Sequence, residues 1–166
     1  NQAFSCQQPG SSAARDVMTA AVGAVHVRQM SAEDLEAVLE IEQGNAKHAW
    51  NEKQVRDALH CTQVLVIDEK VVGFVALLVI VDQAEVQNIS IHIDYQLLGY
   101  GEYLLTHAIK NLTDGVSKVY LEVRVSNFSA IRLYNKTGFT EVGQRRGYYP
   151  TEFGREDALL MCLAIS

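Results

Sequence analysis

The chain has 166 residues, of which 48% are hydrophobic and 20% are charged, and its formal net charge is −6. This length fits a single domain with a sizeable core. An acidic chain lacks the basic face that a general nucleic-acid binder carries. The longest apolar run, Val71 to Val81, is shorter than the roughly 20 residues that a membrane-spanning helix needs. We therefore expect no nucleic-acid partner and no membrane partner.

Residues 1–17 are rich in Gln, Ser and Ala and lack the apolar stretch of a signal peptide. We interpret them as a disordered or added lead-in, with Met18 as the natural start, before a single domain at residues 18–166. The three cysteines and five histidines are scattered and show neither a metal-ligand spacing nor a disulfide framework. We therefore expect no metal and a reducing, cytoplasmic setting.

The first half of the chain combines strand patterns with two helix patterns. Ser31 precedes acidic residues and an apolar helical repeat, which is typical of a helix start, and Gly44 follows the end of that repeat. Asn51 opens a second, shorter repeat. Two β-branched runs on either side of a polar triplet indicate a hairpin. The patterns predict, in order, a strand at 24–30, helices after Ser31 and Asn51, and strands at 62–67, 71–81 and 85–93.

The second half of the chain contains the clearest helix pattern, an apolar stripe that runs from Leu104 to Leu112. Because helices interleave with strands, the order favours the α/β class with helices on both faces of one sheet. The patterns predict a helix at 99–112, a strand at 117–125, a helix from Asn127 to Gly138, and strands at 139–144 and 157–165 joined by a loop at 145–156.

A glycine-containing segment, Gln96-Leu97-Leu98-Gly99-Tyr100-Gly101, follows a predicted strand and opens the clearest helix. Glycines let the backbone approach a ligand closely, and the first amides of a helix form an anion site. The segment is not the dinucleotide fingerprint, because Leu104 occupies the position of its third glycine, and it is not a Walker loop. A bare Gly-x-Gly is common, so these residues alone leave phosphate binding and an ordinary turn both open.

Three polar residues on one strand and the helix after it are candidates for chemistry. Glu122 and Arg124 lie two apart on the predicted strand and therefore share one face. A structural ion pair between them is the simpler interpretation. Tyr134 lies on an apolar helix stripe, where a tyrosine is more often part of a core than of a catalytic site. The residues alone leave both interpretations open.

Residues 96–101 match the pattern Gln/Arg-x-x-Gly-x-Gly/Ala, and the chain in this respect resembles the GNAT acetyltransferases, whose motif of this form binds the pyrophosphate of acetyl-coenzyme A (acetyl-CoA). Residues 87–91 resemble the family strand that splays from its neighbour. The resemblance implies the GNAT fold, an α/β fold in which a central, mostly antiparallel mixed sheet is flanked by helices. It also implies acetyl-CoA as the co-substrate and no metal.

A more specific resemblance lies in the second half of the chain. The runs Leu-Glu-Val-Arg-x-Ser-Asn, Ala-Ile-x-Leu-Tyr and Gly-Phe follow one another over residues 121–139, and Tyr-Tyr-Pro-Thr and Gly-Arg-Glu-Asp-Ala lie at 148–151 and 154–158. These runs are similar to the RimI-like group of the family, which acetylates the N-terminal alanine of a ribosomal protein. The similarity covers residues 25–166. It implies the peptide N-terminus of a small-subunit ribosomal protein as the partner.

The resemblance also implies a role for each site residue. Glu122 is the implied proton acceptor, Tyr134 the implied proton donor, and Asn127 an implied contact to the coenzyme. Tyr148 and Tyr149 are implied to line the groove for the substrate N-terminus, although they could instead pack a long hairpin. The other implied cofactor-binding residues are Ile89, Ser90, Ile91, Leu97, Leu98, Gly99, Tyr100, Gly101 and Glu102.

The chain departs from the family pattern at two points near the expected cofactor site. Leu97 and Leu98 replace residues that are often basic or polar, which bears on cofactor affinity. His92 and Ile93 replace a common Asp-Pro pair, which bears on the local backbone. Two other functions stay open: a GNAT enzyme for another amine, such as lysine, a polyamine or an aminoglycoside, and a module that binds acetyl-CoA or a protein without catalysis.

Overall fold

The computed structural model describes residues 24–166, so the interpretation of residues 1–17 as a lead-in before Met18 lies outside the described residues. The strands are β1 (Val25–Gln29), β2 (Thr62–Ile67), β3 (Lys70–Ile80), β4 (Gln83–Ile91), β5 (Lys118–Arg124), β6 (Thr140–Thr151) and β7 (Gly154–Ala164). The α-helices are α3 (Leu35–Asn45), α4 (Glu52–Asp57), α5 (Tyr100–Lys110) and α6 (Phe128–Lys136). Over the described residues, strands and α-helices follow one another in the predicted order.

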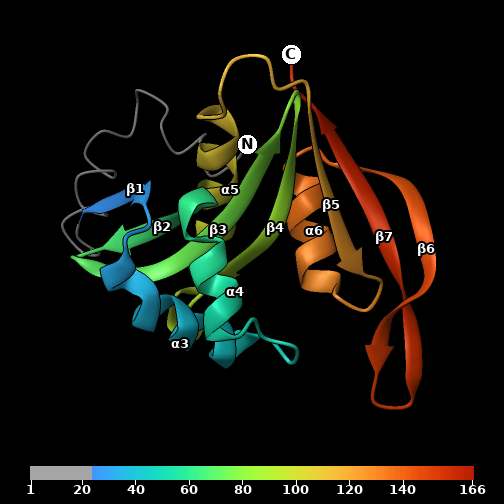
Figure 1. The fold of residues 1–166 in the computed structure, drawn as a ribbon, viewed down its shortest axis with the longest axis horizontal. Coiled ribbons are helices and arrows are strands. Elements are labelled where there is room, and N and C mark those ends of the chain that lie inside the picture. Colours follow the sequence, from blue (N-terminus) through green and yellow to red (C-terminus); the bar gives the residue numbers. More distant parts are fainter. Residues whose placement is uncertain (1–23) are drawn as a thin grey trace. The chain divides into compact units, whose positions relative to one another are not determined.

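The strands form one seven-stranded sheet with the order β1-β2-β3-β4-β5-β7-β6 (Figure 1). Strands β4 and β5 pair in parallel. The pairs β1–β2, β2–β3, β5–β7 and β6–β7 are antiparallel. The predicted α/β fold, with a mixed and mostly antiparallel sheet flanked by helices, is therefore confirmed.

Two compact units divide the described chain. The first unit comprises residues 24–77 and 88–111, and the second comprises residues 78–87 and 112–166. Strands β3 and β4 each contribute residues to both units. The expectation of a single domain at residues 18–166 stays a prediction.

The core of the first unit forms where α3 and α4 pack on β2 and β3. Val38, Val64 and Phe74 are almost fully buried in one apolar cluster. Residues 72–77 of β3 are buried in succession. Since neighbouring side chains of a strand point to opposite faces, this run requires that both faces of β3 be covered. Strand β3 is therefore a firm support for the strand beside it, β4.

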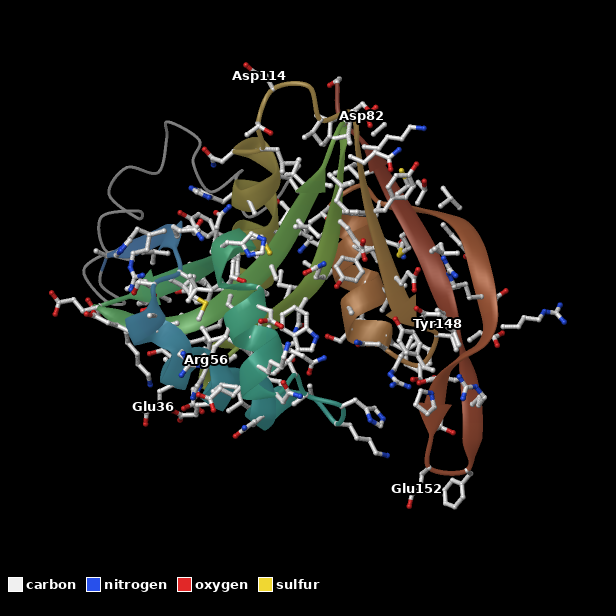
Figure 2. The ribbon with its side chains drawn as sticks, viewed as in Figure 1. Glu36, Arg56, Asp82, Asp114, Tyr148 and Glu152 are labelled. Atoms are coloured by element: carbon white, nitrogen blue, oxygen red, sulfur yellow. The ribbon has the colours of Figure 1, made fainter. Side chains whose placement is uncertain are left out.

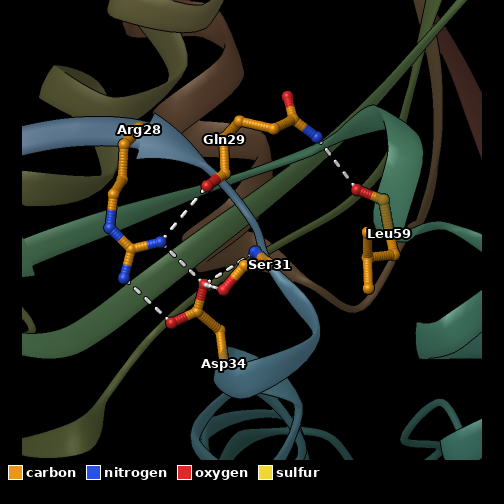
Figure 3. Close-up of polar contacts among 5 residues, drawn as sticks. All are labelled: Arg28, Gln29, Ser31, Asp34 and Leu59. Atoms are coloured by element: carbon orange, nitrogen blue, oxygen red, sulfur yellow. Dashed lines mark hydrogen bonds and ion pairs between the residues drawn. The ribbon is translucent and has the colours of Figure 1, made fainter.

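A charged capping arrangement fixes the helical start after β1 (Figure 3). The backbone N–H of Ser31 donates to Asp34 Oδ2 at 2.8 Å, and the guanidinium of Arg28 donates to both oxygens of Asp34 at 2.7 and 2.9 Å. The hydrogen bond from Arg28 lowers the pKa of Asp34 to about 2. The helix start predicted at Ser31 is confirmed, and it is linked to the preceding strand through this ion pair.

The second unit contains the main error of the sequence-based prediction. Residues 145–156 are not a loop: β6 and β7 continue through them as one long hairpin, with only Glu152 and Phe153 between the strands (Figure 1). The segment is polar and mostly exposed, so it lacks the apolar alternation that predicts a strand. Strand β6 is an edge strand, where Pro150 is tolerated because its missing N–H can face solvent.

Candidate active site

The turn before α5 has the features of an anion site, and it lies in the first unit. Gly99 is the N-cap of α5 with a φ of 87°, a left-handed conformation that glycine adopts without a steric cost. No side chain of residues 24–166 caps this helix start. The N–H groups of Tyr100, Gly101 and Glu102 therefore have no intrahelical partners and sit at the positive end of the helix dipole. This arrangement fits a diphosphate group.

A hydrogen-bond network fixes the end of β4 to the glycine-containing turn. Gln96 Nε2 donates to the carbonyl of Ile91 at 2.8 Å and to Asn45 Oδ1 at 3.1 Å. Asn45 in turn donates to Ser90 Oγ at 2.7 Å and to the Ile91 carbonyl. The two implied cofactor-binding segments, 89–91 and 97–102, are thus held by the same two amide side chains. No motif predicts this role for Asn45, because an asparagine at the end of a helix is commonly an ordinary terminator.

The two departures from the family pattern have visible structural consequences. The ring Nδ1 of His92 accepts from the N–H of Asp94 at 3.1 Å and so caps a short 3-10 helix, Ile93–Tyr95. Leu97 and Leu98 are both exposed and bring no charge to the turn. Any anion bound there must rely on backbone N–H groups rather than on a cation supplied by these two positions.

Glu102 was implied to contact the cofactor, and its side chain is 3% exposed on the inner side of α5. Its backbone N–H, in the first turn of the helix, is placed to contribute to an anion site. The implied role of Glu102 in cofactor binding stays a prediction.

In the second unit, Glu122 and Arg124 do not pair with each other. The carboxylate of Glu122 contacts Arg145 Nε of β6 at 3.2 Å. Arg124 donates to Glu156 Oε1 of β7 and to the carbonyl of Pro150, each at 2.9 Å. The simpler interpretation, an ion pair along β5, is wrong, because the long hairpin supplies each residue with its own partner. Arg145 was missed because it was expected to open a loop.

The two tyrosines of the hairpin stack on these arginines. The guanidinium of Arg124 lies 4.4 Å from the ring centre of Tyr149, and that of Arg145 lies 5.4 Å from the ring centre of Tyr148. The rings of Tyr148 and Tyr149 meet edge to face at 5.0 Å. Figure 2 shows Tyr148 on the β6–β7 hairpin. Burial raises the pKa of Tyr149, and the charge of Glu122 raises it further, so this ring lies within electrostatic reach of the implied proton acceptor.

A β-bulge in β6 contains Tyr148 and changes the direction of its side chain. Arg145 pairs with Ala158 and Tyr149 with Glu156, so residues 146–148 face a single residue of β7. That residue, Asp157, accepts a hydrogen bond from the N–H of Gly147 at 2.8 Å. Bulges of this kind redirect side chains and are common beside active sites.

Tyr134 lies on α6 and is 7% exposed, with its ring 5.8 Å from that of Phe139. Burial raises the pKa of its hydroxyl to about 12, with a smaller contribution from Tyr149. The phenol is therefore protonated throughout the neutral range, so its O–H is available as a donor there. The burial agrees with a core position. Because Tyr149 interacts electrostatically with both Tyr134 and Glu122, Tyr134 belongs to the same group of side chains as Glu122.

Asn127, the implied coenzyme contact, is the N-cap of α6. Its Oδ1 accepts from the N–H of Ala130 at 3.2 Å. The cap predicted from the sequence is confirmed, and the implied contact to the coenzyme stays a prediction.

A surface cavity of about 310 Å³ opens beside Glu122 in the second unit. The pairing between β4 and β5 runs only from Gln83 and Lys118 to Glu85 and Tyr120, although both strands continue. Both residues of this last pair belong to the cavity wall. It is lined by Ile80, Gln83, Ala84, Glu85, Tyr120, Leu121, Glu122 and Leu160.

Residues 24–166 hold no group of three or more His, Cys, Asp or Glu side chains placed to share a metal ion. In the same range, every helix is too short or too polar to cross a bilayer.

A helix start with the features of an anion site, after a strand that separates from its neighbour in a mixed sheet, is the arrangement that the GNAT resemblance implies. Residues 25–139 match the model of the acetyltransferase (GNAT) family, and the chain belongs to this family. The expectation of an acetyltransferase is thereby confirmed.

Comparison with individual relatives indicates which kind of acetyltransferase the chain is similar to. The chain is 40% identical over 141 residues, 82% of its own length and 95% of the relative's, to the [ribosomal protein bS18]-alanine N-acetyltransferase of Salmonella typhimurium. It is similar to the crystal structure of the ribosomal-protein-S18-alanine N-acetyltransferase from Escherichia coli, with a TM-score of 0.81, 39% identity, and coverage of 86% of this chain and 95% of that chain. Arabidopsis thaliana NAA60 in complex with acetyl-CoA, at 18% identity and a TM-score of 0.77 over 86% of this chain and all of that one, shares the fold.

Proposed function

We propose that this chain transfers the acetyl group of acetyl-CoA to the α-amine of an N-terminal alanine of a ribosomal protein, and that it does so in the cytoplasm. The observation that carries the proposal is the 40% identity to an alanine N-acetyltransferase across 95% of that relative's length. A match that covers 82% of this 166-residue chain spans the positions of the implied catalytic residues Glu122 and Tyr134.

The turn before α5 supports acetyl-CoA as the co-substrate. When bound, acetyl-CoA supplies an activated acetyl thioester. The N–H groups of Tyr100, Gly101 and Glu102 would hold its diphosphate. The segment 89–91, fixed by Gln96 and Asn45, would bind the pantetheine arm and offer backbone N–H groups to the developing oxyanion.

Glu122 is the proton acceptor of the proposed reaction. An α-amine has a pKa of about 7.7 to 8.0, so most of it is protonated and unreactive at neutral pH. A carboxylate can remove that proton directly or through water. Arg145 occupies one side of the Glu122 carboxylate, so an arriving ammonium group would compete with it for the same oxygens.

Tyr134 is the proposed donor to the departing thiolate. Its pKa of about 12 means that the hydroxyl carries its proton at any pH where the enzyme would work. A phenol with this pKa is a weaker acid than an ordinary thiol, whose reference value is about 8.5. A hydrogen bond to the thiolate therefore fits this residue better than complete proton transfer.

An acceptor panel with labelled acetyl-CoA tests the proposed function. The panel contains a peptide that begins with alanine, the same peptide with a blocked N-terminus and an internal lysine, spermidine and an aminoglycoside. We expect label only in the peptide with a free alanine N-terminus. Label in the lysine or polyamine acceptors instead would contradict the proposal and favour another GNAT specificity. Calorimetry that detects no acetyl-CoA binding would favour a non-catalytic module.

A further inference from the structure

The cavity beside Glu122 has a second carboxylate, and no cationic side chain lines it. Glu85 and Glu122 both belong to its wall, and Arg145 contacts Glu122. For Glu85, by contrast, the described residues provide no ion pair and no side-chain hydrogen bond. A cavity that combines an uncompensated carboxylate with open access favours a positively charged occupant.

The position of Glu85 relates it directly to the proposed reaction centre. Glu85 pairs with Tyr120, and Tyr120 and Glu122 lie two apart on the same face of β5. The usual strand spacing and rise place the Cα atoms of Glu85 and Glu122 about 8 Å apart. Consecutive Cα atoms of a peptide are about 3.8 Å apart, and a Lys or Arg stem adds several ångström. A cation on the residue after the acceptor alanine can therefore reach Glu85 while the α-amine lies at Glu122.

The rest of the lining suits such a side chain. Tyr120, the strand partner of Glu85, also lines the cavity, and an aromatic ring attracts a guanidinium or an ammonium group. Ile80 and Leu160 offer apolar surface to the aliphatic stem. Gln83 adds a neutral polar group at the rim. Apolar walls, an aromatic ring and one carboxylate together match a basic side chain better than an acidic or purely apolar one.

We propose that this cavity is the subsite for the positively charged side chain of the second residue of the acceptor, and that Glu85 determines this specificity. The inference rests on the proposed function, because it takes Glu122 as the point where the α-amine reacts. It adds a residue, Glu85, to which no catalytic or binding role has been assigned above.

The test compares two peptides and three proteins. The peptides begin Ala-Arg and Ala-citrulline, so they differ only in the charge of the second side chain. The proteins are the wild type, Glu85→Gln, and Glu36→Gln, which removes an equal charge from an exposed position on α3 outside the cavity. The readout is the ratio of kcat/KM for the Arg peptide to that for the citrulline peptide.

We expect the wild type and Glu36→Gln to prefer the Arg peptide by about fivefold, the size of one partly exposed ion pair, and Glu85→Gln to lose that preference. The preference should shrink in 1 M salt, which screens an exposed pair. Charge reversal, Glu85→Lys, should instead favour a peptide that begins Ala-Glu.

The other outcomes separate the inference from the proposed function. An unchanged ratio in Glu85→Gln, with normal acetylation of both peptides, would overturn the subsite and leave the alanine acetyltransferase intact. No acetylation of either peptide by the wild type would overturn both. If Glu85→Gln lowers activity on spermidine but not on the Arg peptide, the cavity holds a polyamine and the peptide subsite is wrong.

Discussion

At the scale of single residues, the contact between Glu122 and Arg145 shapes the proposed site. The guanidinium approaches the carboxylate to 3.2 Å from the neighbouring hairpin and also stacks on Tyr148. A carboxylate held in this way has a restricted orientation, which a proton acceptor needs in order to meet an amine in line. The same contact makes the hairpin part of the proposed site, since β6 supplies the arginine.

Replacing Glu122 with Gln should slow acetyl transfer by about 10²- to 10⁴-fold, the usual contribution of a general base, because an amide cannot accept the proton of the ammonium group. Affinity for acetyl-CoA should stay within about twofold. Single-turnover kinetics and calorimetry measure the two effects. The control Glu141→Gln changes an exposed carboxylate of β6 outside the cavity and should keep the wild-type rate. A fast Glu122→Gln enzyme would exclude the assigned role.

Replacing Tyr134 with Phe should lower the rate of the chemical step and change the alkaline stability. The folded-state pKa of about 12 lies above the reference value near 10, so the unfolded chain loses this proton first. The contribution of this hydroxyl to the free energy of unfolding is fully present below pH 10. It is lost as the pH rises towards 12, by up to about 3 kcal/mol. We therefore expect the melting temperature of the wild type to fall more steeply between pH 10 and 11 than that of Tyr134→Phe. Equal slopes in a thermal-denaturation series would contradict the burial of this hydroxyl.

The sequence identified residue types well and residue partners poorly. Glu122 and Tyr134 could be singled out from the motif, and Asn127 could be recognised as a cap. The partner of Glu122 could not, because strand periodicity reports which residues share a face and says nothing of the neighbouring strand. Asn45 and Glu85 were missed for the same reason: their significance comes from Ser90 and Tyr120, which are distant in sequence.

At the scale of elements, β4 depends on close approach by β3. A Cβ added to Gly73 would lie 2.6 Å from Ile91 Cδ1 and 3.2 Å from the carbonyl oxygen of Ser90. Glycine at this position therefore lets β3 support the segment that is proposed to bind the cofactor. The sequence showed only a glycine within an apolar run, and a strand glycine can mark a bulge as readily as a close approach.

Replacing Gly73 with Val should destabilise the protein by about 1–3 kcal/mol, since an overpacked core must shift side chains and backbone. It should also weaken acetyl-CoA binding, because the displaced atoms belong to segment 89–91. Urea unfolding and calorimetry provide the two readouts. Gly44→Ala is the matched control, since a Cβ there meets nothing within 4 Å. A Gly73→Val protein with wild-type stability would show that β4 can move away at little cost.

The β6–β7 hairpin marks the limit of pattern-based prediction for elements. Its outer half is exposed, so no apolar alternation reveals it, and its strands are held by pairing and by the contact of Asp157 with Gly147. Elements with a buried face, such as β3 and α5, were predicted almost to their ends. The hairpin carries Tyr148, Tyr149 and Arg145, so this part of the proposed site is also the part with the weakest sequence pattern.

At the scale of the whole molecule, the fold could be predicted because the apolar residues of each core helix or strand recur at the period of that secondary structure. The site could not be predicted in this way, because it combines residues that are brought together by the strand order. Strand order places β7 between β5 and β6, and so brings Glu156 to Arg124 and Arg145 to Glu122. Neither the residue patterns nor the family resemblance predicted these two partners. The cavity at the last β4–β5 pair follows from the same topology, and no local motif indicates it.

Binding of acetyl-CoA should stabilise the whole chain, because a ligand that binds only the folded state adds its binding free energy to stability. At one hundred times its Kd the gain is about 2.7 kcal/mol, which for a chain of this size raises Tm by about 5–10 °C. Differential scanning fluorimetry measures the shift.

Gly99→Val should lower the Tm of the free protein and abolish the shift, because a β-branched residue resists the left-handed conformation of the helix cap. Gly115→Val is the matched control: Gly115 has a φ of 94° with no atom within 4 Å of an added Cβ, so the variant should carry similar strain and keep the full shift. Loss of the shift in both variants would mean that strain alone abolishes binding, and the helix cap would then have no special part in holding the coenzyme.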